Sequence, residues 1–316
     1  MLGTIIQQIV NALTIGSIYA LIALGYTMVY GVLRMINFAH GEMFMLGAYA
    51  AFLAISLLVG QIGAAGALAL TAAFFGAILA VGAIGVGIER LAYKPLRNST
   101  RLAPMLSSLG VSLSLVAGVQ ILAGPQPVGF PAFFPNARFS VLGGVVTAQQ
   151  IGILVAAMLL MLGLHMLVNR SRIGVIVRAV SENRPTAQLL GVNVNLAISM
   201  VFFAGPVLGA AGGVLYASYY GIMSPTMGAV IGLKAFTAAI LGGIGSIPGA
   251  VLGSYLLAIV EVLGTALLPV VSGGLLGTEY RDVLAFVILI LVLLVRPAGI
   301  LGEPISEESM VYKREF

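Results

Sequence analysis

Apolar residues occur along this chain in long runs that short polar stretches separate. We expect membrane-spanning or re-entrant helices at residues 10–33, 40–59, 63–88, 104–123, 148–168, 196–217, 228–246, 248–269 and 281–295. Most runs approach the ~20 residues that a helix needs to cross the hydrocarbon. The alternating segments of a transmembrane β-barrel are absent. The pattern predicts an all-α, polytopic transmembrane helical bundle with about nine spans or re-entrant segments, as a single integral membrane domain over 1–316.

Composition supports the same class of protein. Apolar residues make up 60% of the chain and charged residues only 8%, with a mean hydropathy of +1.12. A soluble core cannot hide such an excess, because the surface of a protein this size must be largely polar. The absence of cysteine excludes disulfides and thiolate metal sites, and two histidines are too few for a metal cluster. We therefore expect no metal in this chain.

Enzymatic motifs are missing as well. The glycine-rich stretch Gly242-Gly243-Ile244-Gly245-Ser246 lacks the lysine with which a nucleotide-binding loop reaches phosphate. No Ser/His/Asp grouping and no His-Glu-x-x-His helix is visible. The sequence indicates a protein without a catalytic centre or cofactor of its own.

The basic residues predict an orientation in the membrane. They gather at 90–101 and 170–195, whereas 124–147 holds only Arg138. By the positive-inside rule the first two segments are cytoplasmic and the third is external, which places the N-terminus outside. A full crossing by 228–246 puts the C-terminus and its Lys313 and Arg314 in the cytoplasm; a re-entrant segment there would reverse the tail. Because the charges lie in such loops, the net charge of +5 does not indicate nucleic-acid binding.

The polar segment 170–195 lies between two long apolar runs and is too long to be a simple connection. Arg178 and Glu182 share a helix face at i, i+4. Pro185 suits a break or a first helical turn, and Gly191 suits a left-handed helix end. We interpret the segment as a cytoplasmic docking element, with an ordinary solvated loop as the alternative. The residues predicted to act in it are Arg178, Glu182, Arg184, Ala187, Leu190 and Gly191.

Small residues recur at every fourth position in the run 196–217. Gly205, Gly209 and Gly213 would share one helix face. Small side chains allow helices to approach closely in lipid, where no hydrophobic force draws them together. Tight bundle packing is the favoured interpretation, and lining of a substrate path is the alternative.

Polar residues inside or beside the apolar runs are the candidates for the translocation path. Asn37 is a plausible helix N-cap, and Glu42 would suit a first helical turn, so a structural role is favoured over substrate binding for Asn37, His40 and Glu42. Lys234 and Glu261 flank a tight turn at nearly equal separation, which predicts a buried ion pair between two antiparallel helices. The alternative is that Lys234 reaches the interface while Glu261 faces a polar vestibule.

Five stretches resemble the inner-membrane permeases of branched-chain amino acid ABC importers, the LivH type. These stretches are Gly25-Tyr26-Thr27-Met28-Val29-Tyr30-Gly31, Met35-Ile36-Asn37-Phe38-Ala39-His40-Gly41-Glu42, Glu89-Arg90-Leu91-Ala92-Tyr93-Lys94-Pro95, the long run from Gly232 to Ala250, and Arg296-Pro297-Ala298-Gly299-Ile300-Leu301-Gly302. They are spread over nearly the whole chain, and the fourth is the most specific. Permeases for urea and short amides are similar.

The resemblance implies a set of partners. It implies a second permease subunit, two cytoplasmic ATPase subunits that bind ATP and Mg²⁺, and an external solute-binding protein. It places the chain in a bacterial-type inner membrane, as part of the path for branched-chain amino acids or similar small polar solutes. Ala187 and Gly191 match the spacing of the Glu-Ala-Ala, three residues, Gly pattern that docks on the ATPase, but Pro185 replaces the glutamate.

Two other classes of protein stay open. A secondary transporter or channel would use Lys234 and Glu261 as intramembrane coupling charges and would have no ATPase partner. A membrane-embedded enzyme would need a catalytic grouping that the sequence does not display.

Overall fold

Each predicted apolar run forms a helix in the computed structural model, which describes residues 2–60, 66–97, 99–100, 102–135, 137–141, 143–274, 277 and 280–302. The helices are α1 (Leu2–Leu33), α2 (His40–Gly60), α3 (Ala67–Ile88), α4 (Leu102–Ala123), α5 (Ala148–Arg170), α6 (Arg172–Glu182), α7 (Arg184–Leu189), α8 (Val194–Tyr220), α9 (Met227–Gly242), α10 (Ile247–Val271) and α11 (Arg281–Val295). The tail with Lys313 and Arg314 lies outside the described residues.

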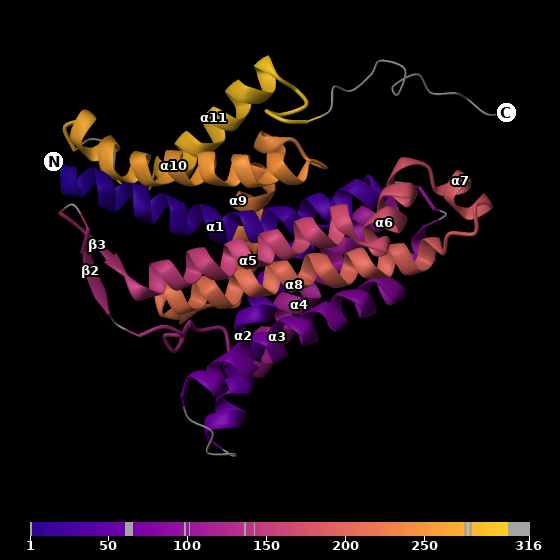
Figure 1. Ribbon diagram of the computed structural model, residues 1–316, viewed down its shortest axis with the longest axis horizontal. Helices are drawn as coiled ribbons and strands as arrows, with labels where there is room; N and C mark the ends of the chain where they lie inside the picture. Colours follow the sequence, from indigo (N-terminus) through magenta and orange to yellow (C-terminus); the bar gives the residue numbers. More distant parts are fainter. Residues whose placement is uncertain are drawn as a thin grey trace.

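The bundle is built from long helices that lie side by side. Within the described residues, seven helices are long and apolar enough to cross a membrane, and α9 and the Ala285–Val295 part of α11 are shorter apolar helices. Figure 1 shows α1, α5, α8 and α10 running lengthwise, with α2, α3 and α4 on one side and α11 outside α10. The all-α, polytopic membrane architecture predicted from the hydrophobic pattern is confirmed.

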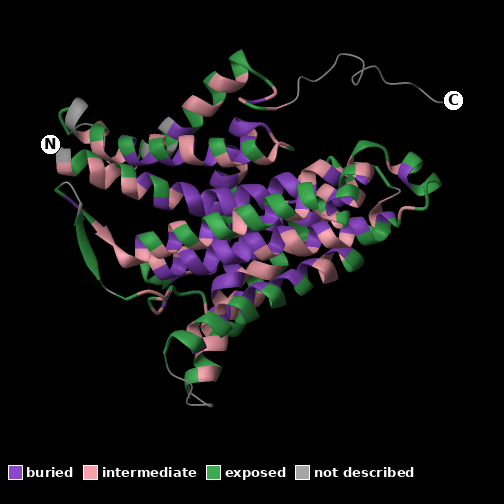
Figure 2. Ribbon diagram, in the orientation of Figure 1, coloured by how far each residue is buried: buried purple, intermediate pink, exposed green. Residues whose placement is uncertain are grey.

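The core lies along α1 and α8. Ile18, Leu21 and Ile22 of α1 and Phe202 and Leu215 of α8 are fully or almost fully buried, and Figure 2 shows the buried residues concentrated on the central helices. The outer faces of α3, α4 and α5 instead expose large apolar side chains, as expected for helices that contact lipid or another subunit.

The two ends of the bundle differ. One end carries α6 and α7, and the other carries the N-terminus and the β2–β3 hairpin (Figure 1). The hairpin joins β2 (Arg138–Val141) to β3 (Gly144–Thr147), and a second antiparallel pair joins β1 (Val128–Gly129) to β4 (Ile222–Met223). None of these strands was predicted from the sequence, because strands of two to four residues are too short to leave a periodic signal.

The small-residue stripe of α8 is packed against two other helices. A Cβ on Gly213 would collide with the Phe44 carbonyl oxygen of α2, and one on Gly205 would lie 3.3 Å from the Gly25 carbonyl oxygen of α1. At Gly209 the nearest atom, His40 Nε2, would lie at 3.5 Å. The predicted close helix–helix packing of Gly205, Gly209 and Gly213 is therefore confirmed.

Gly213→Ala is expected to reduce the yield of folded protein in detergent and to lower its melting temperature. The added methyl group meets backbone rather than a movable side chain, and such overpacking costs about 1–3 kcal/mol. Gly163→Ala in α5 is the matched control, since a Cβ there meets nothing within 4 Å. Equal melting temperatures for the two variants would contradict the close packing of α2 and α8.

Candidate functional site

The segment between α5 and α8 forms two short helices with well-defined ends. Ser171 caps α6 by accepting a hydrogen bond from the Gly174 amide (3.1 Å), and Asn183 caps α7 by accepting one from the Thr186 amide (2.9 Å). Pro185 lies in the first turn of α7, where its missing N–H costs nothing. The helical character expected of this segment is confirmed; its role as a docking element stays a prediction.

Gly191 ends α7 as predicted. Its φ is +80°, in the left-handed region. The Val192 amide donates to the Ala187 carbonyl (3.0 Å) and the Gly191 amide donates to the Gln188 carbonyl (2.9 Å). This pair of bonds is a Schellman motif, which fixes the direction in which the chain leaves α7.

Two arginines fasten these helices to the ends of the long helices. Arg184 donates to the Val32 carbonyl at the end of α1 (2.6 Å), and Arg178 donates to the Val168 carbonyl near the end of α5. Ala187 of α7 is buried. Burial, and then the nearby charge of Arg97, lower the pKa of the Arg184 guanidinium. Arg178 and Arg184 thus bind the two short helices to their own chain.

Another set of residues from the same segment faces outward. Leu189 is 88% exposed and Leu190 is 77% exposed. Glu182 is exposed at the end of α6. These two adjacent leucines form a small apolar projection at the end of α7, which Arg184 fixes to the bundle. We name this projection the α7 knob (Leu189 and Leu190).

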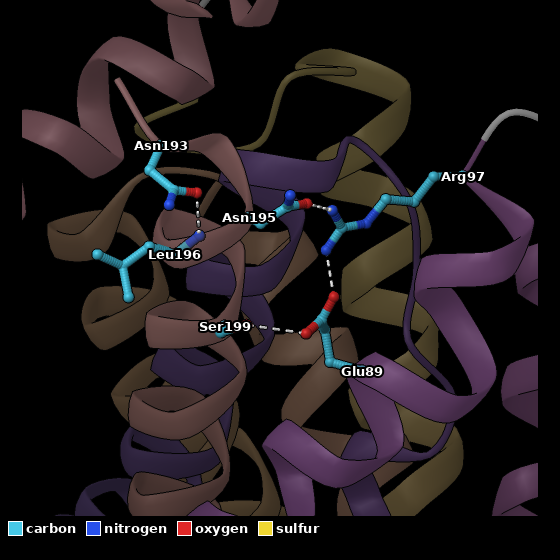
Figure 3. Close-up of polar contacts among 6 residues, drawn as sticks. All are labelled: Glu89, Arg97, Asn193, Asn195, Leu196 and Ser199. Atoms are coloured by element: carbon cyan, nitrogen blue, oxygen red, sulfur yellow. Dashed lines mark hydrogen bonds and ion pairs between the residues drawn. The ribbon is translucent and has the colours of Figure 1, made fainter. Parts of the chain in front are cut away.

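A polar cluster next to this segment joins the end of α3 to the start of α8 (Figure 3). Helix α3 continues into a π-helical turn (Glu89–Tyr93) and a 3₁₀ turn (Lys94–Leu96). Glu89 is buried and forms an ion pair with Arg97, and it also accepts a hydrogen bond from Ser199 of α8 (2.9 Å). Arg97 donates in turn to Asn195 (2.6 Å). The cluster therefore holds the irregular end of α3 against α8.

This cluster borders a cavity of about 350 Å³. Its lining includes Arg90, Lys94, Asn193 and Leu196. The basic residues of this stretch are evident in the sequence, but the cluster is not. The π-helical turn brings Glu89 and Arg97 together at a spacing that regular helix geometry does not predict.

The predicted polar residues near the start of α2 come together inside the bundle. Asn37 accepts hydrogen bonds from the Ala39 amide (3.0 Å) and from the Tyr93 hydroxyl. Because α2 begins at His40, Asn37 stabilises the turn before the helix and is not the N-cap that the sequence predicted. Glu42 lies in the first turn of α2, as predicted, and accepts a hydrogen bond from Ser112 of α4 (3.1 Å). The ring of His40 packs against Tyr26 of α1, with ring centroids 4.6 Å apart.

The predicted ion pair between Lys234 and Glu261 is confirmed. The Lys234 Nζ lies 2.8 Å from Glu261 Oε1, and the Tyr19 hydroxyl donates to Glu261 Oε2 at 2.8 Å. Both partners are buried. Because the pair joins α9 to α10, and Tyr19 joins it to α1, the charges are held within the bundle rather than presented to an open vestibule.

The fold and these sites define a class of protein: a multi-pass membrane protein whose centre is a glycine-lined helix bundle and whose one end carries a short, fixed helical projection. The family model described as "Branched-chain amino acid transport system / permease component" matches residues 8–293. The chain belongs to this family.

Individual relatives match over nearly their whole length. The chain is 45% identical over 307 residues to the high-affinity branched-chain amino acid transport system permease protein BraD of Pseudomonas aeruginosa, covering 96% of this chain and 97% of that one. It is 44% identical to LivH of Escherichia coli K12, with the same coverage. It is 32% identical to the probable branched-chain amino acid transport permease protein LivH of Methanocaldococcus jannaschii, covering 92% and 91%. The resemblance stated from the sequence motifs is confirmed.

Proposed function

We propose that this chain is a permease subunit of an ABC importer and forms part of the translocation path for a branched-chain amino acid or a similar small polar solute. Its relatives are named for branched-chain amino acid transport. The chain supplies the path, and partner ATPase subunits bind ATP and Mg²⁺. A second permease subunit and an external solute-binding protein complete the assembly.

The observation that carries the proposal is the α7 knob. Two leucines are exposed at the end of α7, which Arg184 fixes to the end of α1, and Arg178 fixes the preceding helix α6 to the end of α5. Such a projection suits insertion into an apolar groove of a partner. A movement of the partner would then be passed to the long helices, because the contact is stiff. Coupling of this kind needs a partner whose ATP-bound and ATP-free states engage the knob differently.

The proposed orientation puts this end of the bundle in the cytoplasm. The basic residues Arg90, Lys94 and Arg97 and those of α6 and α7 gather there, whereas the N-terminus and the β2–β3 hairpin lie at the opposite end (Figure 1). The membrane is then a bacterial-type inner membrane, with the N-terminus external and the C-terminus cytoplasmic.

Reconstitution tests this proposal. Proteoliposomes that contain the chain, its second permease subunit and the two ATPase subunits should take up labelled leucine only when ATP and the solute-binding protein are both supplied. ATP must be on the side of the ATPase subunits, and the solute-binding protein must be on the opposite side. In proteoliposomes that hold the permease without its ATPase subunits, a Leu190→Cys variant of this cysteine-free chain should be labelled by an impermeant maleimide from the side on which ATP acts. Uptake that runs on an ion gradient without ATP would instead support a secondary transporter.

A further inference from the structure

Helix α2 begins within the bundle rather than at its end. The ring of His40, its first residue, lies beside the positions of Gly25 in α1 and Gly209 in α8. At 1.5 Å per residue, Gly25 is about 12 Å from the end of α1 at Leu33, and Gly209 is about 22 Å from the start of α8 at Val194. Ser112, the partner of Glu42, lies likewise about 15 Å from the start of α4 at Leu102. The first turn of α2 is therefore deep in the membrane-spanning region.

Two polar side chains in this turn are buried without full hydrogen bonding. Glu42 is 1% exposed, and its Oε2 has no hydrogen-bond partner among the described residues. His40 is fully buried, and neither ring nitrogen makes a hydrogen bond of acceptable geometry within the described chain, although the Ile22 carbonyl lies close by. A buried polar group without a partner costs about 1–3 kcal/mol, so bundle packing alone does not account for these side chains.

Charge balance separates Glu42 from the other buried acids. Three acidic side chains are buried in the part of the chain that the structure describes. Glu89 is paired with Arg97, and Glu261 is paired with Lys234. Glu42 has only the hydroxyl of Ser112 and no cation in that part of the chain. A buried carboxylate of this kind is complementary to a cation that the chain itself does not supply.

Glycines of α2 and α9 meet beside the unpaired oxygen of this carboxylate. A Cβ on Gly228, in the first turn of α9, would collide with Glu42 Oε2. A Cβ on Gly41 would lie 2.7 Å from the Gly228 carbonyl oxygen and 3.2 Å from Gly232 Cα. Helices α2 and α9 therefore approach each other closely at Glu42, and no side chain at position 228 comes between the carboxylate and the backbone of α9.

We propose that the Glu42 carboxylate is the intramembrane contact for the ammonium group of the transported solute, exposed when α9 separates from α2. The ligand class is a small solute that carries a primary ammonium group, such as an amino acid. The charge of the ammonium group would be costly to bury in the membrane without an opposing charge. This inference rests on the proposed importer function.

The test is Glu42→Gln in the complete reconstituted importer. Uptake of leucine is expected to fall by about tenfold or more, with a raised KM, while the variant still assembles with its ATPases. Glu42→Asp keeps the charge and should recover part of the uptake, which a purely structural carboxyl would not require. Full uptake by Glu42→Gln would overturn the inference. Absence of leucine uptake by the unmodified importer would instead contradict the proposed function itself.

If Glu42→Gln does not assemble, chemical labelling of the unmodified importer provides a second test of the inference. Dicyclohexylcarbodiimide reacts with carboxyl groups in apolar surroundings, and mass spectrometry can quantify its adduct on Glu42. Leucine in excess should slow this labelling, whereas 2-hydroxy-4-methylpentanoate, which has a hydroxyl in place of the ammonium, should not. Equal labelling rates with and without leucine, or equal protection by both compounds, would overturn the inference.

Discussion

Lys234→Met alone is expected to deplete the folded protein, because it leaves Glu261 buried without its partner cation. Breaking a buried ion pair from one side costs about 3–5 kcal/mol, which is a large part of the stability of most proteins. The Lys234–Glu261 contact of 2.8 Å joins α9 to α10, so its loss should also loosen the short helix α9. The yield of monodisperse protein in detergent and its melting temperature measure the effect.

The double variant Lys234→Met with Glu261→Gln is the matched control. It removes both charges and keeps side chains of similar volume, so most of the lost yield should return. Transport by the double variant also distinguishes an ion pair that only stabilises the fold from a site that couples transport to an ion gradient. If the double variant folds and transports leucine with ATP, ion coupling through these charges is excluded; if it is as unstable as the single variant, the pair is not what holds the helices.

Leu189→Asp with Leu190→Asp is expected to abolish co-purification of the ATPase subunits without reducing the stability of the chain. Both side chains are exposed, so the aspartates enter water in the free subunit, but they would place two charges in the apolar groove of the partner. Central apolar anchors of an interface each contribute about 2 kcal/mol or more, so retention of the ATPase should fall by well over tenfold.

Phe139→Asp in β2 provides the comparison. Phe139 is also an exposed apolar residue, at 49%, but it lies in the hairpin at the opposite end of the bundle. This variant should retain the ATPase subunits. Loss of the ATPase in both variants would indicate a general effect of new charges rather than a docking surface at α7.

The sequence predicted the parts of this structure that follow from repeating physical patterns. The hydrophobic runs located the spanning helices, since lipid requires continuous apolar helices. The spacing of Lys234 and Glu261 around a tight turn predicted their pairing, because a helical hairpin places equal separations at equal depth. Gly191 was predicted to end α7 because few residues other than glycine adopt its backbone conformation without strain.

Other features depend on contacts that no local pattern encodes. The predicted docking residues Arg178 and Arg184 bind carbonyls of their own chain, since their neighbours come from α5 and from the distant end of α1. The position of Glu42 in the first turn of α2 was predictable from the sequence. Its burial without a partner cation was not, because that burial depends on where α2 begins relative to α4 and α9. The ion pair of Glu89 with Arg97 required a π-helical turn.

The absence of cysteine in this chain allows docking of the ATPase on α7 to be tested directly. A single Leu190→Cys permease, assembled with ATPase subunits that carry a cysteine in their apolar groove, is treated with a short bifunctional thiol reagent. We predict a permease–ATPase cross-link whose yield changes when ATP is bound, while Phe139→Cys gives none. Failure of Leu190→Cys to cross-link in an assembly that transports leucine would contradict the assignment of α7 as the coupling element.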